Sequence, residues 1–238
     1  TDLEISGVEI VSTADVPSGT GLGSSSAFTV GLLHTLNCYK GKYVSQTKLA
    51  EEACKVEIEK LGAPIGKQDQ YAAACGGLNL ITFHQNDMVT VEPIIMNKDT
   101  YHVLEDNLVM FYSGITHDAN KILAEQKQSI SQADKTNNLI QMCELAREMK
   151  SSLENNDTSE FGRILNEGWH LKRQLASGIS GQVIDEMYER AMQNGAAGGK
   201  LLGAGGGGFL LFYCEKEKQP ALEAAMGLRR FDFRFEYD

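Results

Sequence analysis

A glycine- and serine-rich stretch, PSGTGLGSSSA, occupies residues 17–27 and leads into an apolar-periodic run that ends near Tyr39. Alternating glycines allow left-handed backbone conformations and a close approach to a ligand. The serines lie where a helix is expected to begin, so free N–H groups and the helix dipole favour an anion. The stretch predicts a phosphate-binding loop to which Ser24, Ser25 and Ser26 add hydroxyls and one metal ligand. A tight turn with a serine N-cap is the alternative; no Gly-Lys-Ser/Thr follows, which excludes a Walker A loop.

The composition limits the partners that this chain can bind. Its 238 residues are 42% hydrophobic, enough to bury a core, and carry a formal net charge of −10. Nucleic-acid backbones and anionic membrane surfaces both attract clustered Lys and Arg, so neither partner is expected. The five cysteines include no C-x-x-C pair and lie in apolar settings, which predicts reduced, buried thiols and a cytoplasmic location. The longest apolar run, Phe209–Cys214, is too short to cross a bilayer.

Hydrophobic periodicity and turn signals predict an α+β chain of two domains. Strands are expected at residues 3–14, 78–83, 88–93, 108–112 and 209–214, and in the alternating stretch 231–237. Helices are expected at residues 24–39, 45–61, 69–75, 117–130, 133–155, 158–175 and 181–194, and after Pro220. The polar stretch Asn97–Asp106 marks a boundary between a domain at 1–103 and a domain at 104–238. Because both ends alternate as strands do, we expect this sequence to be a fragment of a longer chain.

A second glycine-rich stretch, GAGGGG, occupies residues 203–208 and fits the pattern G-x-G-x-x-G. A dinucleotide-binding loop follows a strand and opens a helix. Here a helix is expected before the loop and the strand Phe209–Cys214 after it, so the dinucleotide interpretation is rejected. A flexible hairpin-like bend is one alternative. Since four consecutive glycines are entropically costly, a close approach to another backbone or to a ligand is favoured.

Within the predicted helix 45–61, Glu57 falls on the apolar face of a helical wheel drawn at about 100° per residue. That face is formed by Leu49, Ala50, Ala53, Cys54, Val56 and Leu61. A carboxylate there is costly unless it is paired or bound to a cation. Glu57 is therefore a candidate metal ligand, and a buried salt bridge to Lys60 or to a distant cation is the alternative.

Asp69 lies at the start of the next predicted helix, twelve residues after Glu57. An aspartate in a first helical turn often serves only as a partner of the helix dipole. Both acids can nevertheless point into one cleft, as a metal ligand and a base would. Elsewhere, the histidines show no zinc spacing. Trp169, with Lys172 and Arg173 nearby, is interpreted as part of a solvated helix face rather than as the wall of a sugar-phosphate pocket.

These segments together resemble the GHMP kinases. Residues 17–27 are similar to that family's ATP-binding motif P-x-x-x-G-L-G-S-S-A, and residues 200–208 resemble its third, glycine-rich motif. Glu57 followed by GKQDQY at residues 66–71 is similar to the galactokinase run in which a magnesium-binding Glu precedes a catalytic Asp. The resemblance implies a two-domain α+β fold with a ribosomal protein S5 domain 2-like N-terminal domain and a ferredoxin-like C-terminal domain. It also implies that the family's first, N-terminal motif is missing.

The resemblance assigns roles to the quoted residues. The ATP phosphates would be held by the loop residues Pro17, Gly19, Gly21, Leu22, Gly23, Ser24, Ser25 and Ser26. Ser25, with Ser24 as the alternate, and Glu57 would bind Mg²⁺. Asp69 would orient, and could deprotonate, the hydroxyl that attacks the γ-phosphoryl group. The second loop would support the phosphate loop and face the substrate through Gly205, Gly206, Gly207 and Gly208.

Within the family, residues 66–73 and 76–79 most resemble the members that phosphorylate D-glycero-D-manno-heptose 7-phosphate at its anomeric hydroxyl, for nucleotide-activated heptose synthesis. Fucokinase-like, galactokinase-like and non-catalytic nucleotide-binding relatives are the alternatives. ATP and a sugar or sugar phosphate are the expected partners, and a homodimer is left open. His117 departs from the family, since relatives often carry Arg there, which weakens any assignment of a phosphate contact at that position.

Overall fold

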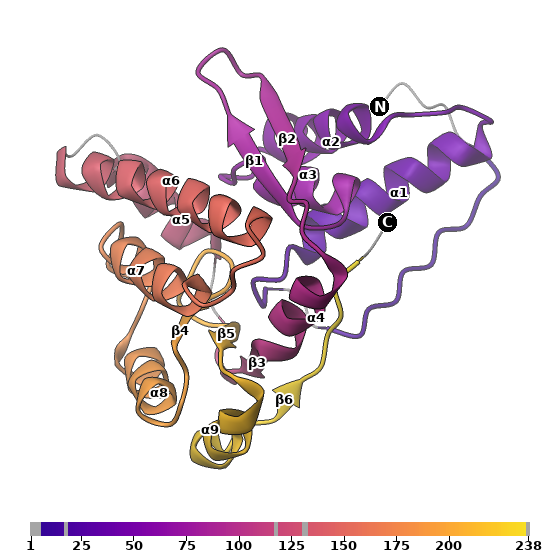
Figure 1. Ribbon diagram of the computed structural model, residues 1–238. Helices are drawn as coiled ribbons and strands as arrows, with labels where there is room; N and C mark the ends of the chain where they lie inside the picture. Colours follow the sequence, from indigo (N-terminus) through magenta and orange to yellow (C-terminus); the bar gives the residue numbers. More distant parts are fainter. Residues whose placement is uncertain (1–5, 17–18, 117–118, 130–132, 237–238) are drawn as a thin grey trace.

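The computed structural model describes residues 6–16, 19–116, 119–129 and 133–236 (Figure 1). In its N-terminal part three helices pack against one another, and a π-helical segment, η1, extends the second of them. These elements are α1 (Ser24–Tyr39), α2 (Gln46–Cys54), η1 (Lys55–Lys60) and α3 (Gln68–Cys75). An antiparallel hairpin follows, formed by β1 (Asn79–Phe83) and β2 (Val89–Pro93). The predicted helices and hairpin of this part are confirmed.

Local chemistry fixes the ends of the helical segment that carries Glu57. The Ser45 hydroxyl accepts a hydrogen bond from the Lys48 amide at 3.3 Å, which makes Ser45 the N-cap of α2. Gly62 follows η1 with a left-handed φ of 67° and ends the segment. The buried face comprises Leu49, Ala50, Ala53, Cys54 and Glu57, whereas Leu61 is exposed. The helical wheel therefore placed Glu57 correctly but not the last residue of its face.

The C-terminal part is a four-stranded antiparallel sheet with the order β4-β5-β3-β6. Its strands are β3 (Leu108–Tyr112), β4 (Gly198–Leu201), β5 (Phe209–Tyr213) and β6 (Arg230–Phe231). Its helices are α5 (Ala119–Ser129), α6 (Ala133–Glu154), α7 (Phe161–Arg173), α8 (Gln182–Gln193) and α9 (Gln219–Met226). Helices lie between β3 and β4 and between β5 and β6, and this arrangement is ferredoxin-like, as predicted.

The largest hydrophobic core lies between this sheet and the helices packed on it. Trp169 of α7 stacks on Tyr188 of α8, with ring centroids 6.0 Å apart, and Tyr188 in turn packs on Phe212 of β5 at 5.7 Å. Trp169 is 1% exposed, so the prediction of a solvated helix face was wrong for this residue. The helix α7 is amphipathic. Lys172 and Arg173 suggest a polar face, but the indole of Trp169 lies on the buried, apolar face of the same helix.

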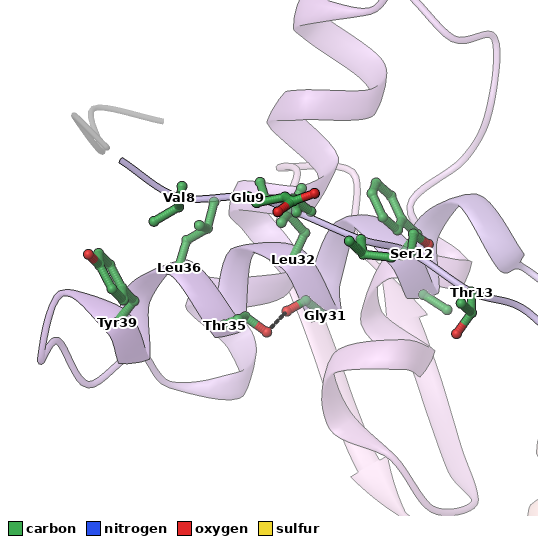
Figure 2. Close-up of a pocket in the computed structure, with 13 residues that line it drawn as sticks. Val8, Glu9, Ser12, Thr13, Gly31, Leu32, Thr35, Leu36 and Tyr39 are labelled. Atoms are coloured by element: carbon green, nitrogen blue, oxygen red, sulfur yellow. Dashed lines mark hydrogen bonds between the residues drawn. The ribbon is translucent and has the colours of Figure 1, made fainter. Parts of the chain in front are cut away.

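Both chain ends depart from the prediction of paired strands. Residues 8–14 form no strand, and residues 1–5 lie outside the described part. Figure 2 shows the extended segment running along α1, with Val8 near Leu36 and Glu9 near Leu32. At the other end only Arg230–Phe231 pairs, with β3, and the next residues continue as coil. The alternation of apolar and polar residues correctly predicts an extended backbone, but a strand also requires hydrogen bonds from its backbone to a neighbouring segment.

The polar stretch taken as a domain boundary is a helix, α4 (Lys98–Asn107). Its N-cap Asn97 accepts a hydrogen bond from the Thr100 amide at 2.7 Å, a local signal that the sequence contained. Glu105 is buried on this helix and holds the C-terminal tail, because it binds Arg234 Nη1 at 2.9 Å and the Phe235 amide at 2.7 Å. The polar composition of this stretch therefore suggested a boundary, although the stretch forms the helix α4, which joins the two parts of the chain.

The five cysteines are free, but only Cys54 and Cys214 are buried. Cys38 and Cys143 are exposed, so the prediction that all five thiols are buried was wrong. Among the described residues no helix combines the length and the apolarity that crossing a membrane requires.

Burial of Trp169 gives a direct test of the core. We expect Trp169→Ala to lower the free energy of unfolding by about 3–5 kcal/mol, because it opens a large cavity between α7 and the sheet. Tyr43→Ala is the matched control, since Tyr43 is 93% exposed and its removal should change stability by less than about 0.5 kcal/mol. Urea denaturation measures both, and equal small effects would contradict the assignment.

Candidate active site

The first glycine-rich loop leads directly into α1. Gly19, Gly21 and Gly23 have φ values of 76°, 82° and 66°, a left-handed conformation that other residues rarely adopt. Gly23 occupies the N-cap position, and the Ala27 amide makes the first intrahelical bond, to the Gly23 carbonyl, at 2.9 Å. The amides before Ala27 thus remain as donors at the positive end of the helix dipole. Pro17 and Ser18 lie outside the described residues.

Behind this loop lies the carboxylate of Glu57, which is 2% exposed. The Ser25 hydroxyl donates to Oε1, and the Ser26 hydroxyl donates to Oε2 at 2.7 Å. Gln70 Nε2, from α3, also donates to Oε2, at 2.6 Å. Among the described residues no cation forms an ion pair with Glu57, so the alternative of a salt bridge to Lys60 is not what the structure shows. Neutral donors from two helices hold the charge in place.

Asp69 lies beside the loop, in the first turn of α3. A Cβ atom added to Gly23 would be 3.4 Å from the Asp69 carboxyl, so the glycine allows this carboxyl to lie against the loop. Asp69 is exposed at the cavity wall, yet partial desolvation raises the pKa of its carboxyl. The nearby Glu57 charge raises this pKa further, and Lys172 opposes the shift. The structure therefore brings the loop, Glu57 and Asp69 together.

The second glycine-rich loop is the turn of the β4–β5 hairpin. A strand and not a helix precedes it, which corrects the prediction, but a strand still follows it, so the dinucleotide interpretation stays rejected. A Cβ atom on Gly203 would lie 2.4 Å from Gly21 Cα, and one on Gly208 would lie 2.2 Å from the Thr20 carbonyl oxygen. The two loops are therefore in direct backbone contact.

Between these two contacts, Gly205, Gly206 and Gly207 are buried in the protein. A Cβ atom on Gly205 would lie 2.7 Å from Ile179 Cα, and one on Gly207 would lie 2.5 Å from the Ile115 carbonyl oxygen. The Gly206 amide donates to the Ile179 carbonyl at 2.9 Å, and the Gly208 amide donates to the Ile115 carbonyl at 2.8 Å. The part of this loop that lines the neighbouring cavity is instead residues 203–204.

That cavity, of about 700 Å³, lies between the N-terminal helices and the C-terminal part of the chain. Its walls include the loop residues Gly21, Leu22 and Gly23, together with Asp69. They also include apolar side chains from α5, from α6 and from the residues that follow α7: Leu123, Leu139, Met142 and Leu175. Two lysines, Lys172 and Lys200, complete the wall. Lys200 is not among the predicted site residues, and for Lys172 the wall of a pocket is the alternative rejected from the sequence in favour of a solvated helix face. No sequence spacing pairs these two lysines, because they come from a helix and a strand that meet only in the fold.

A glycine loop at a helix start, a hydroxyl–carboxylate pair behind it and an aspartate at the wall of a cavity form a combination typical of nucleotide-dependent phosphotransferases. The comparisons agree with this class. The family models described as "GHMP kinases N terminal domain" and "GHMP kinases C terminal" match residues 1–77 and residues 149–231. Together the two matches cover more than half of the chain, which therefore belongs to the GHMP kinases. The fold class predicted from the sequence is confirmed.

Individual relatives are similar over most of this chain. The D-glycero-alpha-D-manno-heptose 7-phosphate kinase of Campylobacter jejuni is 32% identical over 213 residues, which are 90% of this chain and 63% of that protein. The galactokinase of Pyrococcus furiosus is 27% identical over 261 residues, covering 98% of this chain and 72% of the relative. The chain thus spans just under two thirds of the heptose-kinase relative.

Solved structures show the same fold. A protein described as a D-glycero-D-manno-heptose 1-phosphate kinase from Bacteriodes thetaiotaomicron superposes with a TM-score of 0.68 at 30% identity, covering 93% of this chain and 62% of that one. Streptococcus pneumoniae phosphomevalonate kinase superposes with a TM-score of 0.74 at 16% identity, over 90% of this chain and 69% of the other. The second likeness concerns the fold alone.

The contact between the two loops can be tested by adding a single methyl group. We expect Gly203→Ala to lower the free energy of unfolding by about 1–3 kcal/mol, because its Cβ would overlap Gly21 in a left-handed conformation. Gly168→Ala is the matched control: Gly168 lies inside α7 with open space around it, so alanine should stabilise by about 0.5–1 kcal/mol. Equal effects in thermal denaturation would argue against tight loop packing.

The raised pKa of Asp69 predicts a pH-dependent stability. Its carboxyl binds a proton more tightly in the folded state than in the unfolded state, whose pKa is near 3.8, so stability falls as pH rises through the folded pKa. Asp69→Asn should therefore stabilise the protein at about pH 7 and have little effect at about pH 3. Asp157, whose pKa is lowered by its hydrogen bonds to Ser159, is a control of opposite sign. Asp157→Asn should destabilise at about pH 7, and denaturation at both pH values tests the pair.

Proposed function

We propose that this protein is an ATP-dependent sugar kinase that transfers the γ-phosphoryl group to the anomeric hydroxyl of D-glycero-D-manno-heptose 7-phosphate. One observation carries the proposal: a buried Glu57 carboxylate, held by Ser25, Ser26 and Gln70 and without a cationic partner among the described residues, lies behind a glycine loop next to Asp69. The heptose 7-phosphate kinase relative supports the choice of acceptor.

The residues around Glu57 fit a magnesium ion. Mg²⁺ prefers oxygen ligands, and proteins commonly hold it through one or two carboxylates together with substrate phosphates and water. Ser25 and Glu57 supply a hydroxyl and a carboxylate side by side. The buried Gln70 Oε1 has no hydrogen-bond donor in the described part of the chain, so an acceptor beside Glu57 would be available to a bound water. When bound, the ion would neutralise the phosphate charge that develops during transfer.

In this proposal the protein contributes mainly position and charge. The amides of the glycine loop bind the phosphates of ATP, and the apolar cavity wall limits the access of water. The anomeric oxygen attacks the γ-phosphorus, so a new O–P bond forms as the bond from the γ-phosphorus to the bridging β–γ oxygen breaks. ADP leaves with that oxygen, and Asp69 accepts the proton of the hydroxyl. Its raised pKa makes Asp69 a stronger base than an ordinary carboxylate.

Relatives with other printed activities define the alternative acceptors. They include an L-fucokinase/L-fucose-1-P guanylyltransferase of Bacteroides fragilis, 29% identical over 91% of this chain, and the galactokinase described above. A non-catalytic nucleotide-binding homologue is the third possibility, and it is disfavoured because both acids, Glu57 and Asp69, are present.

The experiment is a transfer assay with ATP and Mg²⁺ in which heptose 7-phosphate, fucose and galactose are compared side by side. We expect transfer to heptose 7-phosphate to be fastest, and Asp69→Ala to lower kcat by about 10²- to 10⁴-fold while ATP binding is kept, because the base is lost. Asp232→Ala is the matched control, since that side chain is 89% exposed.

Two outcomes would contradict the proposal. ATP binding by the wild-type protein without transfer to any of the sugars would favour a binding module. Normal turnover by the Asp69→Ala variant would remove the proposed role of this residue.

A further inference from the structure

Two lysines from the C-terminal part of the chain share the cavity wall with the glycine loop. Lys172 lies at the end of α7 and Lys200 lies in β4, against which α7 packs. Both line the cavity together with Gly21, Gly23 and Asp69. A chain with a formal net charge of −10 thus places two cations where the phosphate loop and Asp69 meet.

The lysines are fixed in place but keep donors available. Lys172 Nζ donates to the Gly203 carbonyl at 2.5 Å, which uses one of the three N–H bonds of an ammonium group. Because Gly203 touches Gly21, this bond holds Lys172 next to the phosphate loop. Within the described residues neither lysine forms an ion pair, and the ammonium group of Lys200 has no hydrogen-bond partner.

Keeping Lys172 and Lys200 charged costs free energy when no anion is bound beside them, because both ammonium groups are partly removed from water. Desolvation lowers the pKa of Lys172 to about 7, repulsion from Lys200 contributes, and Asp69 opposes the shift. Desolvation also lowers the pKa of Lys200. Apolar neighbours such as Leu175 and Leu202 line the same cavity, so a charge there interacts more strongly than it would in water. An anion with two negative charges would offset both the desolvation of the two ammonium groups and the repulsion between them.

We propose that Lys172 and Lys200 form a phosphate-binding pair in the cavity wall, an inference that rests on the proposed function. Two phosphate groups of the reaction share the required chemistry: the transferring group of ATP, and the phosphate that a phosphorylated sugar carries. In either case the lysines come from the C-terminal part of the chain and complement the backbone amides of the N-terminal loop. The pair thus needs both parts of the chain to be in contact.

The test uses Lys172→Met and Lys200→Met, which remove the charge and keep most of the apolar stem. Lys127→Met is the matched control, because Lys127 is exposed on the neighbouring helix α5 and does not line the cavity. Each variant is titrated calorimetrically with ATP, with ADP and with heptose 7-phosphate, and assayed with heptose 7-phosphate and the unphosphorylated heptose. The titrations report binding even if no transfer occurs, which separates failure of this proposal from failure of the proposed function.

If the lysines bind the acceptor, we expect the affinity for heptose 7-phosphate to fall by about 10- to 100-fold, with the unphosphorylated heptose unaffected. If they bind the transferring group, kcat should fall with both sugars, and the affinity for ATP should fall more than that for ADP. Unchanged affinities for ATP and heptose 7-phosphate would overturn the proposal. An equal loss of affinity for ATP and for ADP, together with a lowered melting temperature, would also overturn it, because it would indicate a purely structural role for the lysines. If Lys172→Met does not fold, Lys200→Met and Lys172→Gln are compared in its place.

Discussion

The two glycine-rich turns meet backbone to backbone, and the geometry of the site depends on this contact. Gly21 lies against Gly203, and Thr20 lies against Gly208. Neither Gly203 nor Gly208 has room for a Cβ atom. The first turn opens α1, and the second joins β4 to β5. The contact therefore sets the position of the start of α1 relative to the sheet that carries Lys200. Glycine is required here for proximity as much as for its backbone angles.

The charged groups of the site differ in how far they are removed from water and in how they are hydrogen-bonded. Glu57 is buried and accepts hydrogen bonds from neutral donors of α1 and α3, and no cation in the described part of the chain pairs with its carboxylate. Asp69 is open to the cavity, and desolvation together with the Glu57 charge raises its pKa. Lys172 and Lys200 face the same cavity from the other side with lowered pKa values. The cavity is therefore lined by one carboxylate, that of Asp69, and by two lysine side chains, next to the glycine loop.

Contacts away from the site keep the two parts of the chain together. Lys150 of α6 binds Glu92 of β2 at 2.8 Å, which links the C-terminal helices to the N-terminal hairpin. Leu104, Leu108 and Leu153 form a small core that also includes partly buried side chains from the hairpin ends. Figure 1 shows α4 between the hairpin and the sheet. The ion pair, this small core and the contact between the two glycine loops all join the N-terminal part of the chain to the C-terminal part.

The sequence by itself determined what depends on neighbours along the chain. Ser45 as a cap, Gly62 as a stop and the positions of the glycine loops are local, and the apolar face that includes Glu57 follows from helical periodicity alone. Only the tertiary structure decided that Trp169 is buried, that Lys172 and Lys200 share a cavity, and that residues 198–201 pair as a strand. It also decided that residues 8–14 do not form a strand with any described segment. The reason is that burial, desolvation and strand pairing depend on which distant segment lies alongside, and sequence spacing does not encode that partner.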